Sequence, residues 1–383
     1  MSNKTHKTNS IKAAKVISMA ALLFLFGGCG STEKIGDNPA RMLRSTEQAE
    51  ALRQIHIVDT TLQLYTWDYT RDYHLDRLVE NDVNSLAKFI FYLVRDDLHL
   101  LPGMAHLRSV VPGCSCFHIK TQEQEDIVGR NFDYISPRGV SDVIVIRTHP
   151  ANGYKSMGLV SMSILNQPPH SLTDGRTDLS ILMAAPYLVM DGINEKGFFI
   201  GVLYLDGEPT QQHDKQKHDI MTLTAIRLLL DKAATVDDAI NILNQYNMFA
   251  GTSKGSYHFM VADTTGRQAV IEYINDGDLK SWRLTPVEAE YTTNFYLNDG
   301  WREIGHGYDR YDVMRQHIDK ESIGDNETAM RLLQAVAQEP TKEKTSNTQW
   351  SAVYDLQKKC LQLCVGRHYD TVFKFELLRP TWP

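Results

Sequence analysis

The chain has 383 residues, of which 42% are hydrophobic and 23% charged, and its formal net charge is −7 at pH 7. A chain of this length and composition can bury one large core or two ordinary ones, and nothing in it indicates disorder or repeats. Nucleic-acid binding needs clustered Lys and Arg, and no such cluster follows residue 15. The sequence therefore predicts a globular protein whose partner is a small molecule.

The N-terminal segment, residues 1–28, has the organisation of an export signal. Four lysines precede an apolar run over residues 16–26, and this run is too short to span a bilayer. Gly27 and Gly28 then come directly before Cys29. This pattern resembles a bacterial lipoprotein signal, in which the cysteine is lipidated and becomes the mature N-terminus; the alternative is a plain secretory signal. We expect an exported lipoprotein that is anchored to the cell envelope through Cys29.

Four cysteines lie beyond that signal, as one C-x-C step and one C-x3-C step: Cys114, Cys116, Cys360 and Cys364. In an oxidising compartment they could form two disulfides or a metal site. The C-x-C step does not match the usual zinc knuckle and no His-x3-His pair lies nearby, so we expect no metal. Cys360 and Cys364 fit most simply as small apolar residues of a strand pair near the C-terminus.

Residues 29–113, which follow the signal, are predicted to form a tether and a mainly helical pro-segment. Apolar residues recur at helical spacing over residues 40–55 and again over residues 82–98, where the amphipathic pattern is strong. Prolines and glycines then mark residues 101–113 as a loop. The catalytic domain is expected to occupy residues 114–383.

After residue 113 the composition changes to strands and turns. Stretches rich in β-formers cover residues 115–120, 127–132, 140–148, 198–205, 257–263, 268–273 and 290–294. Residues 264–266 carry turn signals that join two of these strands as a hairpin, and residues 222–232 and 236–246 have the pattern of two consecutive amphipathic helices. Strands on both sides of a central helix pair predict a layered α+β sandwich.

Cys114 stands at the junction between the loop and the first of these strands. A cysteine attacks as the thiolate, so it needs a nearby base or positive surroundings that lower its pKa. No histidine of the sequence falls in an obvious partnering motif. An N-terminal residue carries another base, its own α-amine, with a reference pKa of about 7.7 to 8.0. This alternative requires that the chain is cut between Gly113 and Cys114.

The neighbourhood of Cys114 carries two segments of interest, Cys114-Ser115-Cys116-Phe117 and Gly129-Arg130-Asn131-Phe132-Asp133. Together they resemble the choloylglycine hydrolase and penicillin V acylase group and the related linear-amide hydrolases and acyltransferases, all N-terminal-nucleophile enzymes. The steps from Cys114 to Arg130 and from Cys114 to Asp133 are those that this group shows between its nucleophile, its Arg and its Asp. The same steps counted from Cys116 are too short. The register therefore selects Cys114 as the nucleophile.

Further segments keep the order of this group: Asp191-Gly192-Ile193-Asn194-Glu195-Lys196-Gly197, Thr293-Asn294, Asp309-Arg310-Tyr311 and Thr348-Gln349-Trp350-Ser351-Ala352-Val353-Tyr354-Asp355. Tyr204, which follows the first of them, falls where penicillin acylases carry Tyr and bile-salt hydrolases commonly carry Asn. Taken alone, each segment has an ordinary explanation as a turn, a strand end or a solvated helix face. Their joint spacing around one cysteine is far more specific.

The resemblance implies a four-layer αββα sandwich of the N-terminal-nucleophile type, together with a mechanism. Cys114 would cut the chain after Gly113, and its thiolate would then attack a linear amide while the freed α-amine moves the proton. Asp133 would accept hydrogen bonds from that amine and orient it. Arg130 and Arg310 would hold the thiolate and the carboxylate in register.

Two further groups are expected to form the oxyanion hole, the side-chain amide of Asn294 and the backbone N–H of Tyr204. No metal, organic cofactor or nucleic acid is expected. The same residues would serve an acyltransferase, and outside enzymes the alternative is a surface lipoprotein that binds a ligand without turnover. The expected substrate is an N-acyl small molecule, among penicillin V, conjugated bile salts, acyl-homoserine lactones, N-acyl amino acids and N-acylethanolamines.

Overall fold

The computed structural model describes residues 50–97, 113–135, 139–165, 169–173, 179–275, 277, 281–320, 324–341 and 346–379. The expected signal, Cys29 and the tether up to residue 49 lie outside the described residues. Among the helices that the structure describes, none is both long enough and apolar enough to cross a membrane.

The larger of two main sheets contains nine strands, and its middle strands are buried along their whole length. In spatial order the strands are β1 (Ile55–Asp59), β2 (Leu64–Tyr69), β5 (Val143–Thr148), β6 (Ser156–Ser161), β7 (Asp191–Asn194), β8 (Phe199–Leu205), β11 (Ser256–Ala262), β12 (Gln268–Asn275) and β13 (Trp282–Val287). Strands β2 and β5 run parallel, and the other neighbours run antiparallel. Every residue of β5, β6, β7 and β8 is buried, as expected for a sheet covered on both faces.

The smaller main sheet is antiparallel throughout. Its six strands, in spatial order, are β14 (Tyr291–Thr292), β3 (Ser115–Lys120), β4 (Asp126–Ile135), β17 (Ser346–Asp355), β18 (Cys360–Val365) and β19 (Phe373–Glu376). Two short pairs stand apart: β9 (Asp219–Met221) with β10 (Asn247–Phe249), and β15 (Asn294–Phe295) with β16 (Gly305–His306). Where β17 lies against β4, its register shifts between Thr348 and Trp350, so a bulge lies opposite Asp133.

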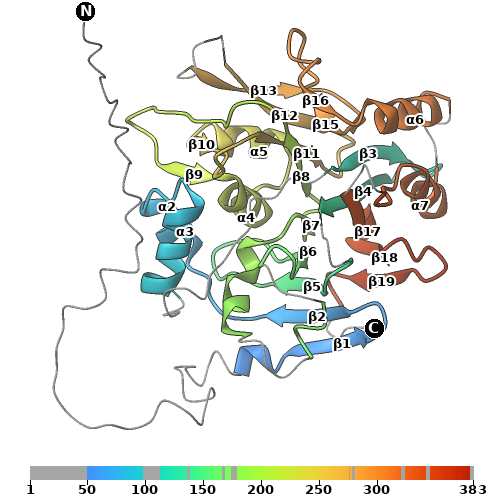
Figure 1. Ribbon diagram of the computed structural model, residues 1–383, viewed down its shortest axis with the longest axis horizontal. Helices are drawn as coiled ribbons and strands as arrows, with labels where there is room; N and C mark the ends of the chain where they lie inside the picture. The colour runs from blue at the N-terminus through green and yellow to red at the C-terminus, as the bar shows by residue number, and fades with distance from the viewer. Residues whose placement is uncertain are drawn as a thin grey trace, which may run out of the picture. The chain divides into compact units, whose positions relative to one another are not determined.

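Helices cover the outer face of each main sheet (Figure 1). The larger sheet is covered by α4 (Thr222–Lys232) and α5 (Val236–Leu243), and the smaller sheet by α6 (Tyr308–Ile318) and α7 (Asn326–Ala335). Other helical segments among the described residues include α2 (Leu75–Glu80), α3 (Leu86–Tyr92), a π-helical turn η3 (Leu93–Asp97) and a 3-10 segment η4 (Leu179–Tyr187). The layers therefore run helices, sheet, sheet, helices.

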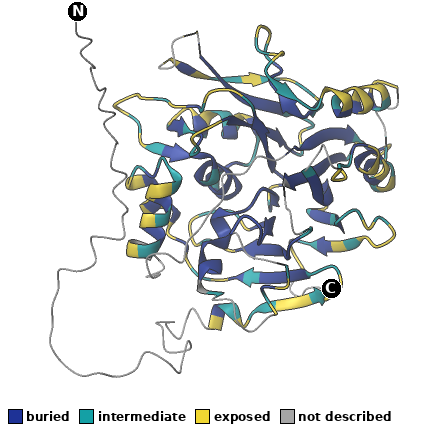
Figure 2. Cartoon of the chain, in the orientation of Figure 1, coloured by how far each residue is buried: buried dark blue, intermediate teal, exposed yellow. Residues whose placement is uncertain are grey.

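The inner faces of the two sheets meet through apolar contacts and one buried carboxylate. Phe199 of β8 and Tyr354 of β17 place their ring centroids 5.0 Å apart. From the smaller sheet, Trp350 Nε1 donates to Asp191 of β7 at 3.1 Å and Tyr354 OH donates to the same carboxylate at 2.5 Å. Figure 2 shows the buried residues gathered in the two sheets, with exposed residues on the outer sides of α6 and α7. The space between the sheets is thus a packed interior.

Much of the predicted α+β organisation is confirmed. Two main sheets are present, and the expected strand over residues 115–120 and the helix over residues 222–232 have the bounds of β3 and α4. The turn at residues 264–266 joins β11 and β12 as predicted. Cys360 and Cys364 lie on β18, which pairs with β17.

The described part of the segment ahead of Cys114 contains two strands besides the helices that were expected. Residues 50–97 contain α2, α3 and η3, but also β1 and β2, and β2 lies inside the larger sheet between β1 and β5. The reason is visible in β2 itself, whose alternating aromatic residues Tyr65, Trp67 and Tyr69 are all buried. Aromatic residues favour strands, and β2 lies between the two stretches, residues 40–55 and 82–98, for which helices were expected.

Candidate active site

Cys114 directly precedes β3, at the inner side of the smaller sheet. Its side chain is fully buried and belongs to the core between the two sheets, as does that of Cys116. Ser115 points the other way, because successive side chains of a strand alternate, and its hydroxyl meets Arg310 of α6. The thiol of Cys114 therefore faces the core between the sheets, and the hydroxyl of Ser115 faces helix α6.

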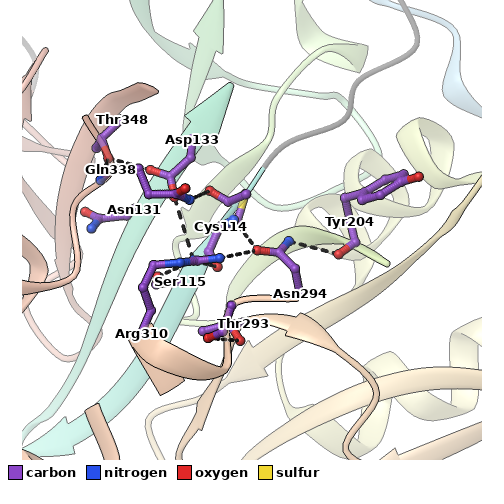
Figure 3. Close-up of polar contacts among 12 residues, drawn as sticks. Cys114, Ser115, Asn131, Asp133, Tyr204, Thr293, Asn294, Arg310, Gln338 and Thr348 are labelled. Atoms are coloured by element: carbon purple, nitrogen blue, oxygen red, sulfur yellow. Dashed lines mark hydrogen bonds and ion pairs between the residues drawn. The ribbon is translucent and has the colours of Figure 1, made fainter. Parts of the chain in front are cut away.

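The backbone of Cys114 is bound on both sides of its Cα. Its N–H donates to Asn294 Oδ1 at 2.6 Å, and its carbonyl oxygen accepts from Arg310 Nη1 at 2.5 Å. The same Nη1 donates to Ser115 Oγ at 2.8 Å. Figure 3 shows these contacts converging on Cys114 from segments far apart in the sequence. The residue is held in place before any substrate is present.

Asn294, the first residue of β15, links Cys114 to the larger sheet. Its Oδ1 accepts from Cys114 N–H and from Arg310 Nη2 at 2.9 Å, and its Nδ2 donates to the carbonyl oxygen of Tyr204 at 2.9 Å. Because Oδ1 faces two donors and Nδ2 faces an acceptor, the partners define the orientation of this amide. The two residues expected to share the oxyanion hole are therefore adjacent, with Tyr204 contributing its carbonyl to the observed contact.

Arg310 reaches Cys114 because the start of α6 leaves room for it. The helix begins after Gly307, whose φ of 89° lies in the left-handed region that favours glycine. A Cβ at Gly307 would also collide with the guanidinium of Arg310. The glycine thus permits both the turn into α6 and the return of Arg310 over the first turn of the helix.

Asp133 of β4 lies opposite Thr348 of β17, beside the bulge. Its carboxylate accepts from Thr348 Oγ1 at 2.5 Å and from Gln338 Nε2 at 2.6 Å, and lies 3.8 Å from Arg310 Nη1. Burial raises the pKa of this carboxyl above its usual range, although Arg310 and the hydrogen bonds oppose the rise. In the intact chain the N–H of Cys114 donates to Asn294 Oδ1, and the backbone of Asp133 acts on the Cys114 thiol by lowering its pKa against the effect of burial.

Arg130 approaches the thiol from the inner face of β4. It donates through Nη2 to the carbonyl oxygen of Val202, and its Nε lies 3.5 Å from Asp191 Oδ2. Burial raises the pKa of Asp191, with Arg130 opposing the rise. Arg130 itself is fully buried. Its charge is therefore shared between Asp191 and the sulfur of Cys114.

The thiol of Cys114 has a raised pKa in the intact chain. Burial raises its pKa above the ordinary value for cysteine, while the positive charge of Arg130 acts in the opposite direction. A thiol with a raised pKa is a poor nucleophile at neutral pH. Activation consequently needs a base at the sulfur, which is what a free α-amine on the same residue would supply.

The six residues expected to form the site, Cys114, Arg130, Asp133, Tyr204, Asn294 and Arg310, are brought together by the fold. Sequence reasoning missed Gln338, which follows α7, and the buried pair His258 and Glu272. His258 Nε2 lies 2.8 Å from the carbonyl oxygen of Thr293, next to Asn294, and its Nδ1 lies 3.2 Å from Glu272 Oε1. No local motif marks these residues, because their partners lie far away in the sequence.

The structure shows the state of the four cysteines for which disulfides or a metal site were left open. Cys114, Cys116, Cys360 and Cys364 all carry free thiols. Burial raises the pKa of Cys360 to about 11, so this thiol is a structural apolar residue rather than a reactive one. Within the described ranges no group of three or more His, Cys, Asp and Glu side chains could hold a metal ion.

Two facing sheets with helices outside, and a buried cysteine at the start of an inner strand, define the N-terminal-nucleophile fold class. The family model described as acyl-coenzyme A:6-aminopenicillanic acid acyl-transferase matches residues 120–370 of the chain, and the protein belongs to this family. The predicted membership of the N-terminal-nucleophile group is thereby confirmed. The matched range includes Arg130, Asp133, Asn294 and Arg310, and begins just after Cys114.

Solved structures similar to this chain include a mutant of the conjugated bile acid hydrolase from Clostridium perfringens, with 16% identity and a TM-score of 0.49 over 69% of this chain and 92% of that one. A second variant of that hydrolase is 15% identical, with a TM-score of 0.49 and the same coverage. The penicillin V acylase from Agrobacterium tumefaciens is 18% identical, with a TM-score of 0.47 over 70% of this chain and 89% of that one. No curated protein sequence matches the chain.

Proposed function

We propose that this protein is a cysteine N-terminal-nucleophile hydrolase that cleaves a linear amide C–N bond of an N-acyl small molecule, after cutting its own chain between Gly113 and Cys114. One observation carries the proposal. The nitrogen of Cys114 is hydrogen-bonded to Asn294 at 2.6 Å, while Asp133 and Arg130 flank its thiol. These are the groups that a free α-amine and a thiolate at this position would use.

In the proposed cycle, the cut converts the backbone nitrogen of Cys114 into a primary amine. The amine takes the thiol proton, and the thiolate attacks the carbonyl carbon of the substrate amide. The carbon–nitrogen bond of the substrate then breaks and the proton passes to the leaving amine. Water hydrolyses the thioester and returns the free thiol. Arg130 stabilises the thiolate, since its charge lowers the pKa of the sulfur against the effect of burial.

The oxyanion of this cycle would be bound by Asn294 Nδ2 together with the backbone N–H of Tyr204. The contact between Asn294 Nδ2 and Tyr204 O supports this assignment, because it keeps the amide at the edge of β8. Arg310 then has a positioning role, since it binds Asn294 Oδ1 at 2.9 Å and Cys114 O at 2.5 Å. Loss of one oxyanion donor typically lowers the rate about a hundredfold or more.

The decisive experiment is to produce residues 30–383 and to follow the chain by intact mass and N-terminal sequencing. We expect a fragment that begins at Cys114, and the Cys114→Ala variant should stay whole. The Cys114→Ser variant should lose most hydrolysis even if it still cuts itself. Hydrolysis is measured on penicillin V, N-acyl amino acids and N-acyl-4-nitroanilides. A wild-type chain that stays whole and inert would favour the alternative of a ligand-binding lipoprotein.

Acyl transfer is the second candidate, and the matching family model favours it by its description as an acyl-transferase. The chemistry up to the thioester is the same, and the two reactions differ only in whether water or an amine takes the acyl group. Turnover of an N-acyl-4-nitroanilide in the presence of rising concentrations of 6-aminopenicillanic acid separates them. An acyltransferase would give an acylated amine at the expense of the free acid.

The location of the protein is a separate part of the proposal. We infer from Cys29 and the residues before it that the chain is exported as a lipoprotein. Labelling with a radioactive fatty acid should mark the wild-type protein, and the Cys29→Ser variant should be unlabelled. An unlabelled wild-type protein in the soluble fraction would favour a plain secretory signal.

A further inference from the structure

The side-chain amide of Gln338 is hydrogen-bonded to the carbonyl oxygen of Gly113, which belongs to the peptide bond that would be cut. Its Nε2 donates to Gly113 O at 3.0 Å and to Asp133 Oδ2 at 2.6 Å. Its backbone is fixed to Thr348 on both sides, through its own N–H to Oγ1 at 2.7 Å and through its carbonyl to Thr348 N–H at 2.9 Å. The amide is therefore held in position rather than loosely placed.

The space around Gly113 is shaped by this contact. A Cβ added to Gly113 would lie 2.5 Å from Gln338 Nε2 and 3.2 Å from Ser346 Oγ. Real Cβ atoms do not approach that closely, so any larger residue at position 113 would move the Gln338 amide. Glycine before the nucleophile thus has a concrete reason in this chain: it lets a side-chain donor reach its carbonyl oxygen.

The side chain of Asn294 binds partners other than the Gly113 carbonyl through its hydrogen bonds to Cys114 and Tyr204. It binds Cys114 N–H through Oδ1 and the Tyr204 carbonyl through Nδ2. In Figure 3, Gln338 and Asn294 lie on opposite sides of Cys114. Two side-chain amides therefore contact the peptide bond before Cys114. The Gln338 amide binds the carbonyl oxygen of Gly113, and the Asn294 amide binds the nitrogen of Cys114.

We propose that Gln338 is the side-chain donor that stabilises the oxyanion of the self-cleavage step, while the Asn294 amide serves substrate turnover. The inference rests on the proposed function. The Cys114 sulfur attacks the Gly113 carbonyl carbon, an S–C bond forms and the carbonyl oxygen becomes the oxyanion that Gln338 binds. The C–N bond to Cys114 then breaks, and the nitrogen takes the proton that the thiol lost.

The resulting thioester needs water to complete the cut into a Gly113 carboxylate and a free Cys114 thiol. Gly113, Gln338 and Arg310 line an open cavity of about 600 Å³. This volume admits water to the Gly113 side of the bond, although the Cys114 side chain itself is fully buried. The geometry therefore supplies both the donor and the second reactant of the self-cleavage.

The test compares two rates in one variant. In Gln338→Met the amide is replaced by a side chain of similar length without a donor. The rate of self-cleavage, followed by intact mass of full-length residues 30–383, should fall about a hundredfold. Turnover of an N-acyl-4-nitroanilide, divided by the fraction of chain that is cut, should fall much less. Equal loss in both rates would overturn the proposal, because Gln338 would then act only through Asp133.

Thr348→Val is the matched control, because it removes the other side-chain hydrogen bond to Asp133 and keeps the side-chain amide of Gln338. The variant also loses the acceptor for the Gln338 N–H, but the bond from Thr348 N–H to the Gln338 carbonyl remains. Self-cleavage and turnover should fall together in this variant. A Thr348→Val chain with the same selective loss of self-cleavage as Gln338→Met would speak against a special role for Gln338.

A double-mutant cycle keeps the test meaningful if Gln338→Met folds poorly. Gly113→Ala should slow self-cleavage in the wild-type background, because the new Cβ displaces the amide, and should add little in Gln338→Ala. Additive effects would overturn the inference. A wild-type chain that never cuts itself would defeat the proposed function as well, whereas a chain that cuts itself but hydrolyses no probe would defeat only the proposed turnover.

Discussion

The side-chain oxygen of Asn294 accepts a hydrogen bond from the backbone N–H of Cys114 at 2.6 Å, across 180 residues of sequence. The nitrogen in this contact is the one that would become the catalytic amine. Its partner is thus in place before the chain is cut. The proposed maturation would change the bonding at Cys114 without a large movement of the residues around it.

Arg310 should be intolerant of replacement by lysine. Its planar guanidinium donates through two nitrogens to Cys114 O, Ser115 Oγ and Asn294 Oδ1, a fork that a lysine ammonium cannot reproduce. We expect Arg310→Lys to slow both self-cleavage and turnover by about a hundredfold. Arg315→Lys is the control, since Arg315 lies on the same helix and half of its side chain is exposed. Equal behaviour of the two variants would refute the positioning role.

Asp133→Asn should separate activity from stability. Burial raises the pKa of the Asp133 carboxyl, so its ionised form costs folding free energy at neutral pH. A neutral amide avoids that cost, and Thr348 Oγ1 can accept from the new NH2 group while Gln338 Nε2 donates to the remaining oxygen. We expect an unchanged or higher thermal midpoint together with a loss of self-cleavage. A midpoint lowered by about 10 °C or more would show that the carboxylate is stabilising instead.

Glu272 should make the loop that carries Asn294 sensitive to acid. Both of its carboxylate oxygens accept hydrogen bonds, from Leu297 N at 2.7 Å and from Asn298 N at 3.1 Å, and Oε1 also faces His258. Although burial alone would raise the pKa of Glu272, these contacts lower it below the usual value of 4.5. For a lowered pKa, the stabilisation is complete above the unfolded value and is lost as the pH falls through the folded one.

The test is thermal unfolding between pH 7 and pH 3, with Glu272→Gln as the comparison. The glutamine would turn an NH2 group toward a backbone donor, so we expect a loss of about 2–4 kcal/mol at neutral pH and a weaker dependence on acid. Glu288→Gln is the control, because the Glu288 side chain is 63% exposed. Parallel pH curves for wild type and Glu272→Gln would contradict the assignment.

The segment ahead of the cut should remain bound to the rest of the protein. Strand β2 is hydrogen-bonded in parallel to β5, and its buried residues include Tyr65, Trp67 and Tyr69. Tyr73 OH also donates to the buried Asp231 at 2.6 Å. Each large buried side chain contributes about 1.5–3 kcal/mol. After cleavage both chains should elute together in gel filtration and separate only in denaturant. Elution of the large chain alone would contradict this.

Much of the fold could be predicted from the sequence, because strands such as β3 and β8 have strong local patterns. The position of β2 could not be predicted in the same way. Its place in the larger sheet depends on parallel pairing with β5, a strand that lies beyond Cys114 in the chain. The alternating aromatic residues of β2 are compatible with a strand, but they do not specify its pairing partner, whereas α4 carries its apolar stripe within its own 11 residues.

The same difference between local patterns and long-range contacts applies to the residues of the candidate site. Cys114, Arg130 and Asp133 could be found because their spacing resembles that of a known family, and they lie on or directly before the hairpin of β3 and β4. Gln338 reaches Gly113 across 225 residues, and its own segment carries no motif. The sequence could indicate Cys114 and the charged residues beside it, but the hydrogen-bond partner of the Gly113 carbonyl depends on how α7 and β17 meet.

The internal position of β2 has a consequence for the order of events in the life of this protein. While the chain is whole, β2 finds its place by an intramolecular search. Once Gly113 and Cys114 are separated, the same strand belongs to a second molecule, and recovery from denaturant depends on the concentration of both pieces. The peptide bond that the proposed cut would remove is thus also the tether that makes folding efficient, and we expect the cut protein to refold poorly from dilute solution.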